Sequence, residues 1–298
     1  MKAIISINHL TKTYKGAKAP ALDSLSLHVA PGEVYGFLGA NGAGKSTTIR
    51  LLLNFIQPTH GSAKIFGKDI VKQATSIRKK VGYLSGDLSM HGQVTGKRLL
   101  DYLASLSGGI DASYRDELVQ RFEAQLDVPI KTLSKGNRQK IGIIQAFMHK
   151  PTALILDEPT TGLDPLMQEE FYKTVREAKS RGAAVFLSSH NLMEAQILCD
   201  RIGIIRRGKL IHEQVVGNGA SLTTPRFNLR LKNKRDGALL ARSPAVTVVS
   251  SSNDTLVITP AHSLRQFFGA LSRYEVDAFS VQVLNLEDEF MEYYGDKS

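Results

Sequence analysis

The sequence predicts an α/β fold built on a parallel sheet, followed by a smaller α+β region. Short continuous apolar runs, typical of buried strands, alternate with amphipathic stretches through the first two thirds of the chain. A glycine-rich segment joins one such run to the stretch that follows it. Near residue 215 the pattern changes to short strands and two helices. We therefore expect one domain over residues 1–215 and a second over residues 216–298.

Composition sets the outer limits of this prediction. The chain has 298 residues, of which 42% are hydrophobic, enough for one large domain and a small one. Its formal net charge of +10 favours an anionic partner, whether a membrane surface, nucleic acid or a nucleotide. The one cysteine, Cys199, excludes an internal disulfide and is consistent with a reducing cytoplasm. Without a run of 18 apolar residues, no span of a bilayer is expected.

The glycine-rich segment matches the phosphate-binding pattern G-x-x-x-x-G-K-[ST]. It follows an apolar strand at 34–38 and precedes a helix at 48–53, and it consists of Gly39, Ala40, Asn41, Gly42, Ala43, Gly44, Lys45, Ser46 and Thr47. Its glycines allow a tight turn whose N–H groups point at phosphates, and the helix N-terminus adds partial positive charge. Lys45 would reach the β- and γ-phosphates, and Ser46 would bind Mg²⁺. Nucleotide binding is the prediction; a glycine-rich turn without a ligand is its alternative.

Two strands are expected before this segment, at 3–8 and 24–29. Tyr14 lies between them, where its ring could stack on an adenine. Taken alone, a tyrosine at such a position more often packs half-buried.

The middle of the chain reads as mainly helical. A short strand at 81–84 precedes it, and Thr95 is expected to cap a helix from Lys97 to Leu106. Apolar spacing then predicts helices at 112–126 and from Gly136 to about Met148. We expect a helical subdomain over about 86–150.

Acidic residues follow the next apolar strand, 153–156. A strand that ends in an aspartate such as Asp157 is where a nucleotide-hydrolysing enzyme holds its Mg²⁺, and Glu158 could orient or deprotonate the attacking water. An acidic pair that only caps a turn is the alternative. Asp164 could be a helix N-cap, and His190 ends another strand at the edge where ligands bind in open α/β sheets, although a lone histidine there is more often structural.

Taken together, these motifs resemble the ATP-binding cassette of ABC transporters. The diagnostic segment is Leu133-Ser134-Lys135-Gly136-Asn137, which looks like the family's signature sequence, and all the motifs stand in the family's order. The resemblance runs from about residue 3 to residue 215. It implies a P-loop cassette with a RecA-like core, a β-subdomain and a helical subdomain.

The resemblance also implies roles for the residues. Two subunits would pack head to tail around two ATP molecules, with Lys45 and Ser46 of one facing Ser134 and Gly136 of the other. Glu158 would be the general base and His190 the γ-phosphate contact. Asp164 would make a contact across the dimer, and Tyr14 would be the adenine platform. Asp157 would bind Mg²⁺ beside Ser46.

Two departures from the family pattern stand out. The glutamine that usually follows the 81–84 strand is replaced by Gly86, with Asp87 beside it as a candidate oxygen donor. The signature has Lys135 and Asn137 where glycine and glutamine are more usual, and we expect Lys135 to point to water.

After residue 215 the sequence predicts a small α+β domain. Strands are expected at 227–231, 246–250, 255–259 and 279–284, with helices at 262–274 and from Asn285 to Tyr294. This region resembles the C-terminal extension of ABC-2-type, mostly exporting, cassette subunits. Dimer support, partner contact and simple packing on the cassette remain open as its role.

The sequence thus predicts a Mg²⁺-dependent ATPase subunit of an ABC export system. Its expected partners are a second cassette subunit, identical or related, and a polytopic permease that holds it on the cytoplasmic face of the membrane; nucleic acid is not expected. The alternatives are a soluble cassette ATPase acting on nucleic acid or ribosomes, and a regulatory ATP-binding subunit with little turnover. The cargo is not encoded in this chain.

Overall fold

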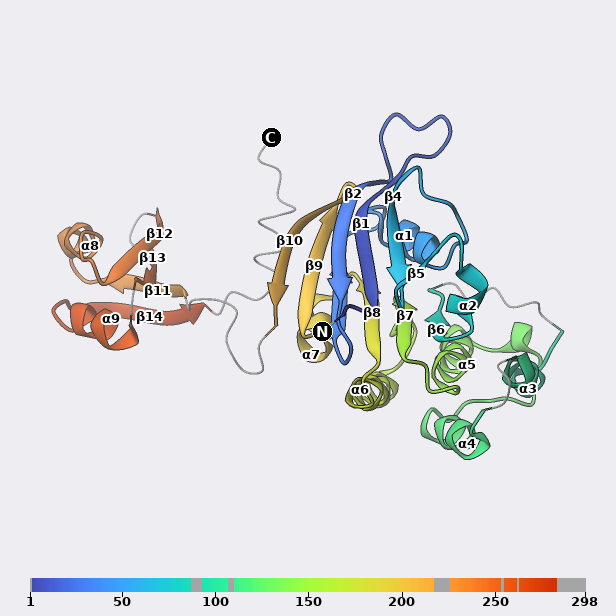
Figure 1. The fold of residues 1–298 in the computed structure, drawn as a ribbon. Coiled ribbons are helices and arrows are strands. Elements are labelled where there is room, and N and C mark those ends of the chain that lie inside the picture. Colours follow the sequence, from blue (N-terminus) through green and yellow to red (C-terminus); the bar gives the residue numbers. More distant parts are fainter. Residues whose placement is uncertain are drawn as a thin grey trace. The chain divides into compact units, whose positions relative to one another are not determined.

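The computed structural model describes residues 2–86, 93–106, 110–216, 226–252, 255–261 and 263–282. The chain forms two compact units, Met1–Val216 and Gly217–Ser298 (Figure 1). Among the described residues, no helix has the length and apolar character needed to cross a membrane.

The first unit is built on a six-stranded sheet with the order β10-β9-β3-β8-β7-β6. Five strands run parallel, namely β3 (Val34–Leu38), β6 (Val81–Leu84), β7 (Ala153–Asp157), β8 (Ala184–Ser189) and β9 (Arg201–Arg206). The edge strand β10 (Lys209–Val215) runs antiparallel to β9. Strands β3, β7 and β8 are buried along their whole length, which explains why they read as continuous apolar runs. The parallel α/β fold predicted from the sequence is confirmed.

A second, antiparallel sheet covers the first, with the order β2-β1-β4-β5. Its strands are β1 (Ile5–Lys12), β2 (Leu22–Val29), β4 (His60–Ile65) and β5 (Lys68–Asp69). Strand β1 continues four residues beyond its predicted end at residue 8, because His9 adopts a φ of 46° and shifts the pairing register without ending the strand.

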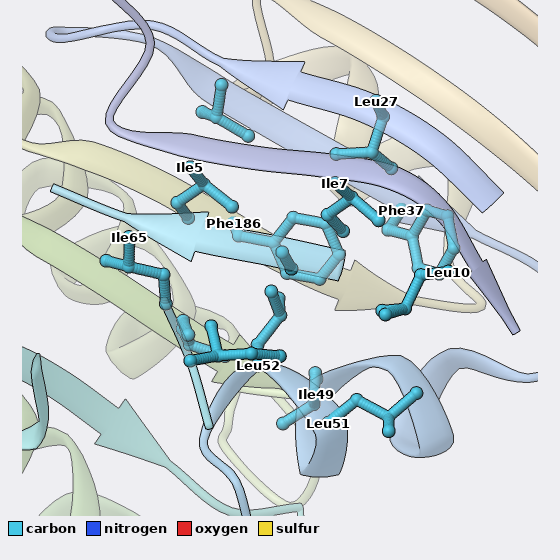
Figure 2. Packing of buried hydrophobic residues seen from close by; sticks show 14 of the residues in the cluster. Ile5, Ile7, Leu10, Leu27, Phe37, Ile49, Leu51, Leu52, Ile65 and Phe186 are labelled. Carbon is cyan, nitrogen blue, oxygen red and sulfur yellow. The ribbon is translucent and has the colours of Figure 1, made fainter. Parts of the chain in front are cut away.

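The core between the two sheets also contains the helix that follows the glycine-rich loop, α1 (Lys45–Leu52). Figure 2 shows Ile5 and Leu10 of β1 beside Phe37, Phe186 and Leu52, and all five side chains are buried. Hydrophobic packing in this core therefore fixes the position of helix α1, and the N-terminus of the helix lies at the edge of the sheet.

The helical region contains α2 (Ala74–Arg78), α3 (Gly96–Leu106), α4 (Ala112–Arg121) and α5 (Lys135–Phe147). The Thr95 hydroxyl accepts a hydrogen bond of 3.3 Å from the Arg98 N–H, as expected of an N-cap. Helix α4 is shorter than the predicted 112–126, because Glu123 takes a left-handed φ of 48° and ends it. Helices α6 (Pro165–Ser180) and α7 (Leu192–Leu198) complete the unit.

An ion-pair cluster fastens α4 to α6. The Arg121 guanidinium contacts Glu170 at 2.5 Å, Glu177 at 2.9 Å and the Thr174 hydroxyl at 3.2 Å. These acidic groups raise the pKa of Arg121, against the lowering effect of burial. Ion pairs, as well as packing, therefore hold the helical region against α6.

The second unit has the element order β11 (Arg226–Leu231), α8 (Lys234–Leu240), β12 (Val246–Ser252), β13 (Thr255–Pro260), α9 (Leu264–Leu271) and β14 (Val276–Gln282). All pairs in its β12-β13-β11-β14 sheet are antiparallel, which gives the βαββαβ, or ferredoxin-like, arrangement. Phe227 and Phe267 stack at the centre of its core, with ring centroids 4.5 Å apart.

Several predictions for this unit need correction or fall outside the description. Helix α8 was not expected, and α9 is shorter than the predicted 262–274. Strand β14 begins at Val276, three residues before the predicted start at 279. The end of that predicted strand and the helix expected over 285–294 lie outside the described residues.

Candidate nucleotide-binding site

Three strands of the central sheet end at the same edge. In the parallel register Leu38 of β3 pairs with Ser189 of β8, and Asp157 of β7 pairs with Ser188 of β8. The loop after β3, the acidic pair after β7 and His190 after β8 are thereby brought to one place. Crevices at such carboxyl ends are where open α/β sheets bind ligands.

The glycine-rich loop owes its shape to close backbone contacts. Gly42 and Gly44 have φ angles of 80° and 118°, in the left-handed region that glycine adopts without strain. A Cβ atom on Gly39 would lie 2.6 Å from the Ile205 carbonyl oxygen, and one on Gly44 would lie 2.8 Å from the Ala21 carbonyl oxygen. Only glycine fits there, so the backbone N–H groups and the first turn of α1 stay exposed to an anion.

A cavity of about 470 Å³ lies against this loop. Its lining includes ten residues predicted for the site: Ala40, Asn41, Gly42, Gly44, Lys45, Ser46, Thr47, Asp157, Glu158 and His190. Gly39 and Ala43 belong to the loop but do not line the cavity. Arg50, Tyr83 and Thr161 line it without having been predicted.

Three of the predicted residues form a chain of polar contacts across the cavity. The Lys45 ammonium, 6% exposed, donates to the Gly39 carbonyl at 2.5 Å and lies 3.4 Å from one Glu158 oxygen. The other Glu158 oxygen lies 2.6 Å from Nδ1 of His190, whose ring is exposed. The carboxylate is held between two groups that can carry positive charge, and this fixes its direction.

Asp157 and Ser46 supply the oxygen atoms suited to a magnesium ion. Asp157 is 8% exposed and accepts a short hydrogen bond from the Ser188 hydroxyl, while Ser46 is exposed at the start of α1. No cluster of three or more acidic, histidine or cysteine side chains that could hold a metal occurs in the part of the chain that the structure describes. Mg²⁺ usually takes one or two protein oxygens and fills its shell with phosphate and water, so this donor set fits it.

Gly86, at the position where the family resemblance predicts a glutamine, faces this carboxylate. A Cβ atom on Gly86 would lie 3.2 Å from the Asp157 carbonyl oxygen and 3.6 Å from its carboxyl carbon. Asp87, the candidate substitute donor, lies outside the described residues.

Four predicted residues outside the glycine-rich loop also do not line the cavity. Tyr14 follows β1 and is 39% exposed, with the Lys12 ammonium 5.4 Å from its ring centre. Ser134 caps α5, where its hydroxyl accepts from the Asn137 N–H at 3.2 Å, and Asp164 caps α6. Gly136 lies in the first turn of α5. The N-cap interpretation of Asp164 is therefore correct, and both cap residues are exposed.

Gln139 and Glu194 are buried polar residues near the site that were not predicted. Gln139 of α5 and Glu194 of α7 are 3% and 1% exposed. Glu194 accepts a hydrogen bond of 2.6 Å from the Ser189 hydroxyl, beside His190, and burial raises the pKa of Glu194 to about 7. The available signal was a polar residue inside an apolar helical register, since Gln139 is one turn before Ile143.

Comparison with known proteins bears directly on this site. A family model described as "ABC transporter" matches residues 22–161, which include the glycine-rich loop, Ser134 and the acidic pair. The daunorubicin/doxorubicin resistance ATP-binding protein DrrA of Streptomyces peucetius is 34% identical, over 98% of this chain and 92% of its own length. This chain belongs to the ABC transporter family.

Other ABC proteins agree with this membership. The bacitracin transport ATP-binding protein BcrA of Bacillus licheniformis is 38% identical over 72% of this chain and 70% of its own. A solved ATP-binding subunit of an ABC transporter superposes with a TM-score of 0.66 and 28% identity, over 72% of this chain and 90% of its own. The chain is therefore an ABC transporter ATP-binding protein, and the first unit has the fold of an ABC cassette.

Proposed function

We propose that this ABC cassette hydrolyses ATP with Mg²⁺ and powers an export-type transporter. The observation that carries the proposal is the chain of contacts from Lys45 through Glu158 to His190 across the cavity at the glycine-rich loop. It places a cation for phosphate, a carboxylate for water and an imidazole side by side.

Each group has a defined part in this reaction. The loop N–H groups and Lys45 would hold the phosphates of ATP, and Glu158 would orient or deprotonate the attacking water. His190, already hydrogen-bonded to Glu158, would contact the γ-phosphate. Ser46 and Asp157 would hold Mg²⁺, which neutralises phosphate charge when bound. Catalysis would come mainly from positioning and electrostatics.

A second cassette subunit would complete each site. Ser134 and Asp164 are exposed at the N-termini of α5 and α6, and neither lines the cavity of its own chain. Helix N-termini favour anions, so we infer that Ser134 and Gly136 meet the γ-phosphate bound by a partner subunit, identical or related. Tyr14 would stack on the adenine, because its side chain is exposed and a flat aromatic ring can receive a base.

A groove suits a cytoplasmic segment of a permease. This groove, of about 550 Å³, has apolar walls that include Phe55, Leu103 and Leu106, with Arg78 and Lys79 also lining it. We propose that a permease segment with apolar and acidic side chains docks there. Tyr83 lines both this groove and the nucleotide cavity, so a permease segment bound in the groove would respond to ATP binding through this residue.

The cargo class is proposed from the named relatives. One relative is named for daunorubicin and doxorubicin resistance and another for bacitracin transport. We therefore propose export of a drug or peptide antibiotic, with the chain bound to the cytoplasmic face of the membrane through its permease. Action on nucleic acid or ribosomes is not favoured by these relatives, although the charge of +10 would permit it.

The function is tested by replacing Glu158 with glutamine in the full chain. We expect the Glu158→Gln variant to bind Mg²⁺-ATP with wild-type affinity, to form an ATP-dependent dimer, and to lose at least about a hundredfold in turnover. Binding is measured with a fluorescent ATP analogue, dimer formation by light scattering and turnover by phosphate release. Near-wild-type turnover by the variant would refute the assignment of the base.

A further inference from the structure

The side chain of Gln139 on α5 contacts backbone carbonyl groups that are distant from it in the sequence. Its side-chain Nε2 donates to the Pro159 carbonyl oxygen at 2.7 Å and lies 3.5 Å from the Glu158 carbonyl oxygen. The amide is 3% exposed, and it reaches across twenty residues of chain. A buried donor aimed at two successive carbonyls fixes the position of the turn that carries them.

The turn that Gln139 holds has a disfavoured backbone. Glu158 has a φ of 47°, in the left-handed region that a residue with a side chain rarely adopts. Such a conformation persists where the surroundings impose it. The Glu158 N–H donates to the Ser188 carbonyl at 3.1 Å, and its carbonyl accepts from the Thr161 N–H at 3.3 Å. Gln139 adds the restraint that comes from outside the sheet and the turn.

We propose that Gln139 is a positioning residue that aims the Glu158 carboxylate and couples it to the N-terminus of α5. The inference rests on the proposed function, in which Glu158 is the general base. Gln139 acts on the main chain of Glu158 and Pro159, and the side chain of Glu158 keeps its own contacts to Lys45 and His190. Loss of the amide therefore leaves the phosphate-binding loop intact and misdirects the base.

A second contact joins the same two segments. A Cβ atom on Gly136, in the first turn of α5, would lie 2.6 Å from the Gly162 carbonyl oxygen. Helix α5 thus touches the 158–162 segment at two points one turn apart, through Gly136 and through Gln139. Movement of the α5 N-terminus when it meets a partner's γ-phosphate would be transmitted to Glu158 by this rigid connection.

The inference predicts a separation between binding and turnover. Gln139→Met removes the donor and keeps the length of the side chain, and Gln139→Glu keeps its shape without the N–H donors. In the full chain we expect both variants to lower kcat for Mg²⁺-ATP about tenfold, the loss typical of one buried hydrogen bond, with KM within about twofold of wild type. The matched control is Gln120→Met, at an exposed position of α4, which should change neither constant.

A double variant shows whether Gln139 acts through Glu158. In the Glu158→Gln background the second change, Gln139→Met, should lower the residual turnover by less than about twofold. An unchanged kcat in the single variants would overturn the inference, and so would an undiminished tenfold loss in the double variant. If Gln139→Met does not fold, Gln139→Glu gives the same comparison. Wild-type turnover by Glu158→Gln would instead refute the proposed function, whereas loss at Glu158 without loss at Gln139 refutes this inference alone.

Discussion

Replacing Glu194 with glutamine should make the stability of the protein less dependent on pH. Glu194 is 1% exposed, and one of its oxygens accepts no hydrogen bond from the residues that the structure describes. Its pKa is raised from 4.5 to about 7, mainly by burial; Glu158 also raises this pKa, while the Ser189 and Thr160 hydroxyls and His190 lower it. The charge of Glu194 also raises the pKa of Tyr172 and of Cys199.

The sign follows from where the proton is bound. Between about pH 4.5 and pH 7 the folded protein keeps the proton on Glu194 while the unfolded chain has lost it. The favourable contribution of protonated Glu194 to the free energy of unfolding is therefore fully present below the pKa of Glu194 in the unfolded chain. This contribution is lost as the pH rises through the pKa of Glu194 in the folded protein. At about 1.4 kcal/mol per pKa unit, the loss between about pH 5 and about pH 8 is about 2–3 kcal/mol.

The assay is urea unfolding of both proteins, followed by circular dichroism, across that range of pH. Glu194→Gln cannot titrate at this position, so its free energy of unfolding relative to wild type should rise by about 2–3 kcal/mol from about pH 5 to about pH 8. Glu169→Gln, at an exposed position of α6, is the control and should keep a constant difference. Parallel pH profiles for wild type and Glu194→Gln would refute the reasoning.

Three further predictions concern stability, nucleotide binding and the partner. Arg121→Met should lower the free energy of unfolding by about 2 kcal/mol, because it strands the Glu170 carboxylate, whereas Arg115→Met, which breaks pairs with more exposed acids, should cost less than about 1 kcal/mol in urea unfolding. Tyr14→Ala should weaken binding of a fluorescent ATP analogue about tenfold while Tyr14→Phe does not, and equal affinities would contradict the adenine platform. Leu106→Glu, in the groove of Phe55 and Leu103, should abolish co-purification with the permease and leave ATP binding unchanged, whereas Tyr102→Glu, an exposed position of α3 outside the groove lining, should retain the permease.

The strands that position the site could be read from the sequence because they are buried on both faces. Val34–Leu38 and Ala153–Asp157 are continuous apolar runs, and parallel strands covered on both faces require such runs. Strand β4 is not predicted from the sequence, because only Ala63 and Ile65 of its six residues are buried. The alternation of apolar and polar residues is therefore too short to recognise. Helix α8 escaped because Asp236 and Gly237 are weak helix formers.

The candidate site also has one part that the sequence predicts and another part that it does not predict. The glycine-rich loop is local, so its nine residues and the helix after it follow from one pattern. Gln139 and Glu194 act through contacts with Pro159 and Ser189 that depend on how separate elements pack, and spacing along the chain does not specify those. The roles assigned to Tyr14 and Ser134 depend on a bound nucleotide and a second subunit, and they stay predictions.

The central claim, that this chain is an ATPase working on a membrane transporter, is tested most directly by what it binds in the cell. Tagged full chain would be purified from gently solubilised membranes, the co-purifying protein identified, and ATP hydrolysis measured with and without it. We predict a stoichiometric polytopic protein with several apolar spans of about 20 residues each, which changes the hydrolysis rate. Recovery of the chain in the soluble fraction on RNA or ribosomes, with no membrane protein bound, would contradict the account.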